Sequence, residues 1–173
     1  LTIPIRVEYL VNPAYGLNFS NTMVLSITMV VPLVTDIGST PIWGRAYDKF
    51  NLAYVRTSAA IFFLLGLFLF FQSKSLPLLC LSSALIGTGV GGGTMVWTLW
   101  VTKVAPKGME ASYMSLHLFF TGTRGLPAPF LGYWILVNLG PRAVSWGSAI
   151  LIMLGCLVFI KLASDKRLRP KYS

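Results

Sequence analysis

Long apolar stretches, separated by short polar segments, dominate this chain. A helix needs about 20 mostly apolar residues to cross the hydrocarbon core of a membrane. Five stretches meet that length: 21–43, 52–71, 76–100, 112–138 and 143–160. Residues 1–20 predict the end of a preceding span plus an external loop, because turn-forming residues are frequent there. Residues 165–173 predict a basic tail. The pattern predicts an all-α, polytopic membrane helical bundle, with about five complete transmembrane helices within residues 21–164.

The composition agrees with a lipid environment. Apolar residues make up 55% of the chain and charged residues 11%, whereas a soluble domain has about 25% charged residues. The net charge of +9 comes from basic residues between apolar runs and at the C-terminus, so we expect a lipid bilayer and no nucleic acid as partner. Cys80 and Cys156 lie inside apolar runs and indicate buried thiols. No His, Cys and carboxylate residues have metal-ligand spacing, so no metal and no cofactor is expected.

The basic residues alternate in side from one predicted span to the next. Three lie on one side: Arg6, Lys74 and Arg142. Ten lie on the other: Arg45, Lys49, Arg56, Lys103, Lys107, Lys161, Lys166, Arg167, Arg169 and Lys171. Cytoplasmic loops carry an excess of Lys and Arg, so we expect an integral protein of a cell membrane with its C-terminus in the cytoplasm. Aromatic residues favour the headgroup level, and several lie at the predicted cytoplasmic ends: Trp43, Trp97, Trp100 and Tyr113.

The first predicted cytoplasmic loop has a recognisable order of residues. It reads Gly44-Arg45-Ala46-Tyr47-Asp48-Lys49-Phe50-Asn51-Leu52. This order resembles the signature loop of the major facilitator superfamily, in which Gly, Asp and a basic residue stand where Gly44, Asp48 and Lys49 stand here. Asn51 occupies a place where glycine is commonest, and both residues tolerate a left-handed turn. Leu52 takes the place of a usual basic residue.

The resemblance implies a secondary transporter that moves a small-molecule substrate by alternating access, coupled to a proton or solute gradient. It implies that this chain is the C-terminal six-span half, without most of its first span, and that an N-terminal half of the same chain is its partner. It also implies that Gly44, Arg45, Asp48 and Lys49 act as a latch that stabilises one closed face. The alternative is a solvated turn that only sets topology.

Asp36 and His117 lie inside predicted spans at similar depth. At about 1.5 Å per helical residue, Asp36 lies about 10 Å and His117 about 8 Å from the cytoplasmic edge. A lone carboxylate at such depth is costly, so Asp36 is a candidate for proton coupling or for a conformational switch. Alternatively, Asp36 bonds neighbouring hydroxyl groups such as those of Thr35 or Thr40. His117 could pair with Asp36, or it could be an ordinary hydrogen-bonded helix residue.

Arg124 lies about 18 Å deep, near the membrane midplane, and arginine stays charged there. Pro127 and Pro129 cannot donate to the carbonyls of Thr123 and Gly125. Arg124 therefore either satisfies those carbonyls or faces a cavity, where it would meet an anionic substrate group or Asp36.

Residues 87–93 contain five glycines. They match G-x-G-x-x-G, but we reject a dinucleotide site because the motif sits in an uncharged apolar run and does not follow a strand. The same residues form small-xxx-small pairs, which allow close helix packing: Gly87 with Gly91, and Gly89 with Gly93. Three prolines predict kinks that neighbouring helices must satisfy: Pro32, Pro127 and Pro129.

Two other functions remain possible at this point. A membrane-embedded enzyme that uses Asp36 and His117 would need a second carboxylate, or a nucleophile with its base, at matched depth. The sequence offers neither, so no catalytic residue is assigned. A non-transporting scaffold, or a relic of a transporter, would need Asp36 and Arg124 only for folding.

Overall fold

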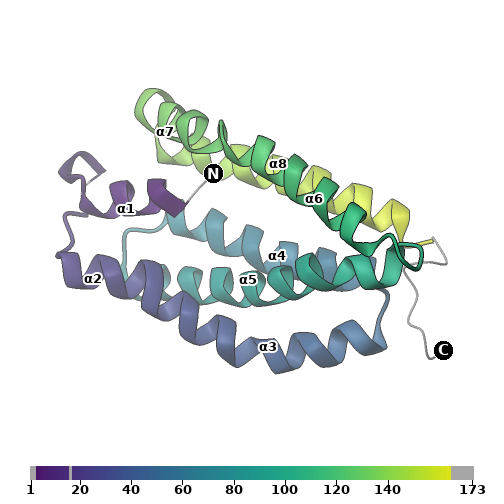
Figure 1. Ribbon diagram of the computed structural model, residues 1–173. Helices are drawn as coiled ribbons and strands as arrows, with labels where there is room; N and C mark the ends of the chain where they lie inside the picture. The colour runs from purple at the N-terminus through teal and green to yellow at the C-terminus, as the bar shows by residue number, and fades with distance from the viewer. Residues whose placement is uncertain (1–2, 16, 165–173) are drawn as a thin grey trace.

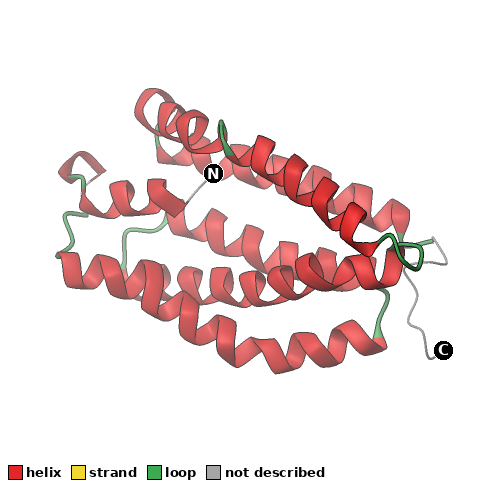
Figure 2. Ribbon diagram, in the orientation of Figure 1, coloured by secondary structure: helices red, strands yellow, loops and turns green. Residues whose placement is uncertain are grey.

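The computed structural model describes residues 3–15 and 17–164, in which all regular secondary structure is helical (Figure 2). The prediction of an all-α membrane bundle is confirmed. The predicted tail, residues 165–173, lies outside the described residues. The elements are α1 (Ile3–Val11), a 3-10 turn (Pro13–Tyr15), α2 (Asn21–Leu25), the π-helical segment η2 (Ser26–Val30), α3 (Val31–Lys49), α4 (Leu52–Gln72), α5 (Leu76–Val104), α6 (Glu110–Gly125), α7 (Ala128–Leu139) and α8 (Pro141–Leu162).

Four helical stretches among the described residues are long and apolar enough to cross a membrane. They are Asn21–Lys49, Leu52–Gln72, Leu76–Val101 and Pro141–Leu162. The remaining predicted span, 112–138, is not one continuous helix but two, α6 and α7, which are interrupted at residues 126–127. The interruption falls where Pro127 and Pro129 predicted a kink. The cause is local, because Pro127 and Pro129 lack the N–H groups that would continue the hydrogen-bond ladder.

The bundle is built around α5. Helix α3 packs on one side of α5 and α4 on another, and α8 packs against α4 (Figure 1). The α3–α4 and α5–α6 connections lie at the same end of the bundle as the end of α8, whereas the α4–α5 and α7–α8 connections lie at the opposite end. A hydrogen bond of 2.8 Å from Asn51 Nδ2 to the Ala163 carbonyl ties the α3–α4 connection to the end of α8. This arrangement gathers Arg45, Lys49 and Lys103 at one end.

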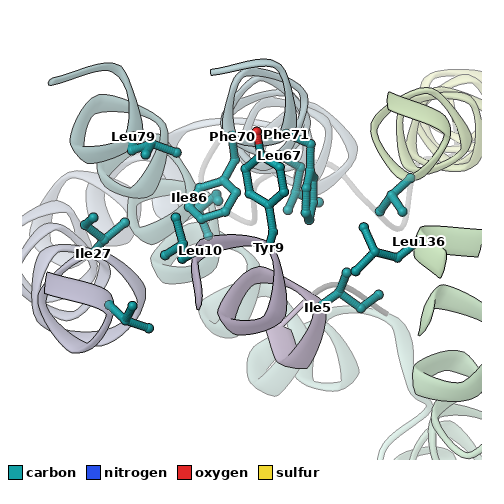
Figure 3. Close-up of a cluster of buried hydrophobic side chains, with 12 residues drawn as sticks. Ile5, Tyr9, Leu10, Ile27, Leu67, Phe70, Phe71, Leu79, Ile86 and Leu136 are labelled. Atoms are coloured by element: carbon teal, nitrogen blue, oxygen red, sulfur yellow. The ribbon is translucent and has the colours of Figure 1, made fainter. Parts of the chain in front are cut away.

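Helix α1 is a packed part of the bundle. Its residues Ile5, Tyr9 and Leu10 are buried in a cluster with side chains from α4, α5 and α7 (Figure 3). The Tyr9 hydroxyl donates a hydrogen bond of 3.1 Å to the Ser73 carbonyl at the end of α4. The Tyr9 ring also packs against the rings of Phe70 and Phe71. The segment predicted to end a preceding span therefore closes the end of the bundle that carries the α4–α5 connection.

Arg6 is a buried cation inside this end of the bundle, although the sequence places it among the loop charges. Its side chain is 3% exposed. One of its terminal nitrogens, Nη2, donates to the Ile27 carbonyl at 3.3 Å and to Ser83 Oγ at 3.1 Å. The guanidinium also lies 4.6 Å from the centre of the Phe70 ring. Arg6 thus links α1 to η2 and α5.

The carbonyl that accepts from Arg6 is left open by the backbone of the neighbouring helix. In the π-helical register the Val31 N–H bonds to the carbonyl of Ser26, five residues earlier. The next residue in that register would bond to Ile27, but it is Pro32, which has no N–H. An unsatisfied carbonyl in a membrane interior costs several kcal/mol. Arg6 supplies the missing donor, and the carbonyl and Ser83 in turn solvate its charge.

We predict that Arg6 and Pro32 are energetically coupled. Arg6→Met should lower the free energy of unfolding by about 1–3 kcal/mol, because it leaves the Ile27 carbonyl without a donor. In a Pro32→Ala background the cost should be smaller, because residue 32 then has an N–H. Unfolding in detergent micelles measures the double-mutant cycle, with the exposed Arg142→Met as control. If the destabilisation of the double variant equals the sum of the two single-variant values to within about 0.5 kcal/mol, the coupling is contradicted.

Candidate functional site

Helices α3 and α5 touch through glycine. At Gly87, an added Cβ would overlap the Pro32 carbonyl oxygen and the Thr35 hydroxyl. At Gly91, it would lie 2.8 Å from Asp36 Oδ1 and 2.9 Å from Ser39 Oγ. At Gly87 the obstacle is the Pro32 backbone, so only glycine permits this approach, whereas at Gly91 the Asp36 and Ser39 side chains would have to shift. The contact brings the Asp36 carboxylate against the backbone of α5.

The intervening glycine faces α4. A Cβ on Gly89 would lie 2.6 Å from the backbone nitrogen of Phe63 and 2.8 Å from the Ala59 carbonyl oxygen. Gly93 is less constrained, because its nearest neighbour, Arg56 Nη1, would be 3.6 Å away. The predicted small-residue pairs are therefore divided between two partner helices: Gly87 and Gly91 meet α3, and Gly89 meets α4.

The Asp36 carboxylate is half-buried and has neither a hydrogen bond nor an ion pair with any of the described residues. The neighbouring hydroxyl groups satisfy main-chain carbonyls instead. Ser39 and Thr40 donate to the Asp36 carbonyl at 3.1 and 2.9 Å, and Thr35 donates to those of Val31 and Pro32. The hydroxyl bonds considered for this carboxylate are thus directed elsewhere, and its oxygens remain available to a proton or a cation.

The second feature is a groove of about 440 Å³ between α5 and α6. The His117 ring packs edge-on against Trp97, with centroids 4.1 Å apart, and lies 5.2 Å from the Trp100 ring. The guanidinium carbon of Arg124 lies 6.0 Å from the centre of the Trp97 ring. The residues that define this α5–α6 groove are Trp97, Trp100, Tyr113, Leu116, His117, Phe120, Thr121 and Arg124.

The groove is positive and carries unsatisfied polar groups. Arg124 is exposed and has no hydrogen bond to any of the described residues, so it does not satisfy the carbonyls of Thr123 and Gly125. Arg56 on α4 is close enough for its charge to act on Arg124 and on His117. Trp100 Nε1 and His117 Nε2 are buried without a partner, at a cost of about 1–3 kcal/mol each. Neither nitrogen is accessible from the groove in this conformation, so Arg124 is the polar group that a ligand would meet.

The structure unites two of the three charged candidates and separates the third. His117 and Arg124 share the groove, whereas Asp36 lies at the α3–α5 contact. Within the described chain, Asp36 forms no ion pair with His117 or Arg124. The aromatic residues Trp97 and Trp100 on α5 and Tyr113 on α6, expected in a headgroup belt, also line the groove. On α6 the helical spacing could have indicated this, because one face carries residues 113, 117, 120 and 124.

The signature loop is fixed to α5 and α8 while its charges stay exposed. Tyr47 is buried, and its hydroxyl donates to the Leu99 carbonyl at 2.8 Å. Asn51 Oδ1 accepts from the Ala53 N–H at the start of α4, so the departure from glycine at this position supplies an N-cap. In the described part of the chain no ion pair involves the three exposed charges Arg45, Asp48 and Lys49. Gly44 lies in ordinary contact distance of Met95, at 3.7 Å.

Comparison with known proteins identifies the class of this bundle. The family model of the Major Facilitator Superfamily matches residues 7–172. The chain therefore belongs to the major facilitator superfamily and is an integral membrane protein. The MFS-type efflux transporter phmH of Phaeosphaeria nodorum is 25% identical over 138 residues, which cover 72% of this chain and 24% of that protein. The chain thus matches about a quarter of the length of this relative.

We predict that Gly87→Ala destabilises the protein and that Gly147→Ala does not. The new methyl group at position 87 would meet the backbone of Pro32, which cannot move aside, so overpacking should cost about 1–3 kcal/mol. Gly147 in α8 has nothing within 4 Å of an added Cβ, so alanine there should be neutral or stabilise by up to about 1 kcal/mol. Thermal unfolding in detergent measures both. Equal melting temperatures for the two variants would contradict the close contact.

Proposed function

We propose that this chain is the C-terminal half of a secondary transporter that moves a small solute by alternating access. The observation that carries the proposal is the α5–α6 groove, in which Arg124 and His117 lie among aromatic rings without hydrogen-bond partners among the described residues. Charged side chains within membrane-spanning segments mark substrate and ion pathways. Membership of the superfamily, and a relative that is called an efflux transporter, support the same function.

A groove of this kind conducts a solute only when another surface covers it. No residue of α6 is buried, and the groove is open on one side. We propose that an N-terminal half of the same protein covers it, so that solute binds between two halves that rock against each other. The exposed charges Arg45, Asp48 and Lys49 would contact that half as a latch when one face closes.

Asp36 is the proposed coupling group. A half-buried carboxylate without a partner among the described residues offers a site for a proton or a cation. Its position against Gly91 means that a change in its charge acts directly on the α3–α5 contact. The π-helical segment η2 lies one turn and a half before Asp36 on the same continuous helix, and such segments frequently occur at functional sites. Protonation of Asp36 would thereby bias α3 between two packings against α5.

The proposed orientation places the α3–α4 and α5–α6 connections and the end of α8 in the cytoplasm of the cell that holds the protein in its plasma membrane. The support is charge: Arg45, Lys49, Lys103 and Lys161 belong to this end of the bundle. Lys and Arg are enriched on the cytoplasmic side. No catalytic role is proposed for any residue.

We predict that Asp36→Asn and Arg124→Ala abolish or uncouple transport and leave membrane insertion intact. At Arg124, loss of one charged hydrogen bond to the solute, about 1.5–3 kcal/mol, corresponds to at least about tenfold weaker solute binding. At Asp36, loss of the carboxylate should abolish the dependence of transport on the pH gradient. Flux of a panel of labelled solutes into proteoliposomes, with and without a pH gradient, measures both effects. The exposed Arg142→Ala is the matched control.

Two outcomes would count against this assignment. Normal coupled transport by both variants would reject the site residues. Loss of folding as the sole effect of both changes would instead favour a non-transporting scaffold.

A further inference from the structure

The walls of the α5–α6 groove suit a flat ring. Two indole rings from α5, Trp97 and Trp100, line the same groove as the phenol and phenyl rings of Tyr113 and Phe120 from α6. Aromatic rings pack best against other rings in offset or edge-on geometry, and His117 already uses the edge-on arrangement against Trp97. At about 440 Å³, the groove falls within the range of about 300–1,000 Å³ that holds ordinary small ligands.

The charge in the groove has one sign. Arg124 supplies a guanidinium that has no hydrogen bond to any described residue, and a second positive charge, Arg56 of α4, lies beside Gly93 of α5. The lining residues include no carboxylate. A guanidinium binds planar oxyanions through two parallel hydrogen bonds, and in a membrane interior it requires such a counter-charge. A cationic ligand would be repelled here.

Two further nitrogens lie in side chains that line the groove, but both are buried in this conformation and would reach a ligand only if those side chains moved. Trp100 Nε1 can only donate, and neutral His117 can donate or accept at Nε2. A solute or a lipid headgroup could supply the anion, because the Arg124 guanidinium lies 6.0 Å from the Trp97 ring, close to the end of the predicted span 76–100. The probes below present the anion as a soluble carboxylate.

We propose that the α5–α6 groove selects planar aromatic anions, such as ring systems that carry a carboxylate. The anion binds Arg124 and the ring lies on the aromatic wall. This inference rests on the proposed transport function and specifies its substrate class. Neutral aromatic compounds lack the group that Arg124 requires, and aliphatic anions lack the ring.

Three probes test the two halves of the proposal separately in the purified full chain. Equilibrium dialysis of labelled 2-naphthoate should show saturable binding of one molecule per chain. The neutral isostere 2-naphthamide should bind at least about tenfold more weakly, because it leaves the arginine charge unpaired. Cyclohexanecarboxylate, which keeps the charge but loses the ring, should also bind at least about tenfold more weakly.

Variants assign these preferences to residues. Arg124→Gln should weaken naphthoate at least about tenfold and leave naphthamide unchanged, which also shows that the variant is folded. Trp97→Leu should weaken naphthoate more than cyclohexanecarboxylate. Arg142→Gln, an exposed arginine away from the groove, should change neither. Equal affinities for naphthoate and naphthamide, or unchanged naphthoate binding by Arg124→Gln, would overturn the proposal.

Flux measurements separate this inference from the proposed function. Naphthoate could bind as expected but fail to cross the membrane of proteoliposomes that contain the protein. That result would contradict the proposed transport function and would leave the proposed class of ligand, planar aromatic anions, in place. Alternatively, the protein could transport another solute in a way that depends on Asp36 and is not inhibited by naphthoate. That result would contradict aromatic anions as the substrate class and would leave the proposed transport function in place.

Discussion

The close contact of α5 with α3 and α4 is the constraint on which the rest of the bundle depends. Lipid offers no hydrophobic force to drive helices together, so they associate where small residues allow their backbones to approach. Gly87 and Gly91 provide that approach toward α3, and Gly89 provides it toward α4. The uncharged first part of α5 thereby fixes the bundle. Its last turns are free to present Trp97 and Trp100 to α6. One helix thus carries both the contact that holds Asp36 and the wall of the groove.

The helical backbone is interrupted near Pro32 and near Pro127, and the two interruptions differ in whether a side chain satisfies the carbonyls left without a backbone donor. At Pro32 the open carbonyl of Ile27 is satisfied by Arg6, which comes from α1. The hydrogen bond from Arg6 therefore stabilises that break, which lies at the end of the bundle where α1 packs. At Pro127 no side chain among the described residues takes the corresponding role, because Arg124 points its charge into the groove. Unsatisfied, proline-broken turns bend more readily than intact helix. The helix that carries the substrate candidates is consequently the one with a bend beside them.

Hydropathy predicted the fold well because membrane spans are defined by length and apolarity. Four stretches appear as continuous helices close to the expected bounds. The break at Pro127 was predicted from the prolines and not from hydropathy, which measures only length and apolarity. Arg6 was assigned to a loop because hydropathy cannot show an open carbonyl 21 residues away. Depth alone also matched Asp36 with His117. Depth says nothing about the direction in which a side chain leaves its helix, and Gly91 and Trp100 lie on opposite faces of α5 at 3.6 residues per turn.

The most direct test of the account is whether water reaches the groove from both sides of the membrane. Thr121 lines the groove and can be changed to cysteine in a background that lacks Cys80 and Cys156. A membrane-impermeant maleimide is then added to right-side-out and to inside-out vesicles. We expect Thr121→Cys to be labelled from both sides, and Leu151→Cys on the exposed surface of α8 to remain unlabelled because it faces lipid. If Thr121→Cys is unlabelled in one or both of the two vesicle orientations, the result would contradict a solute pathway through the α5–α6 groove.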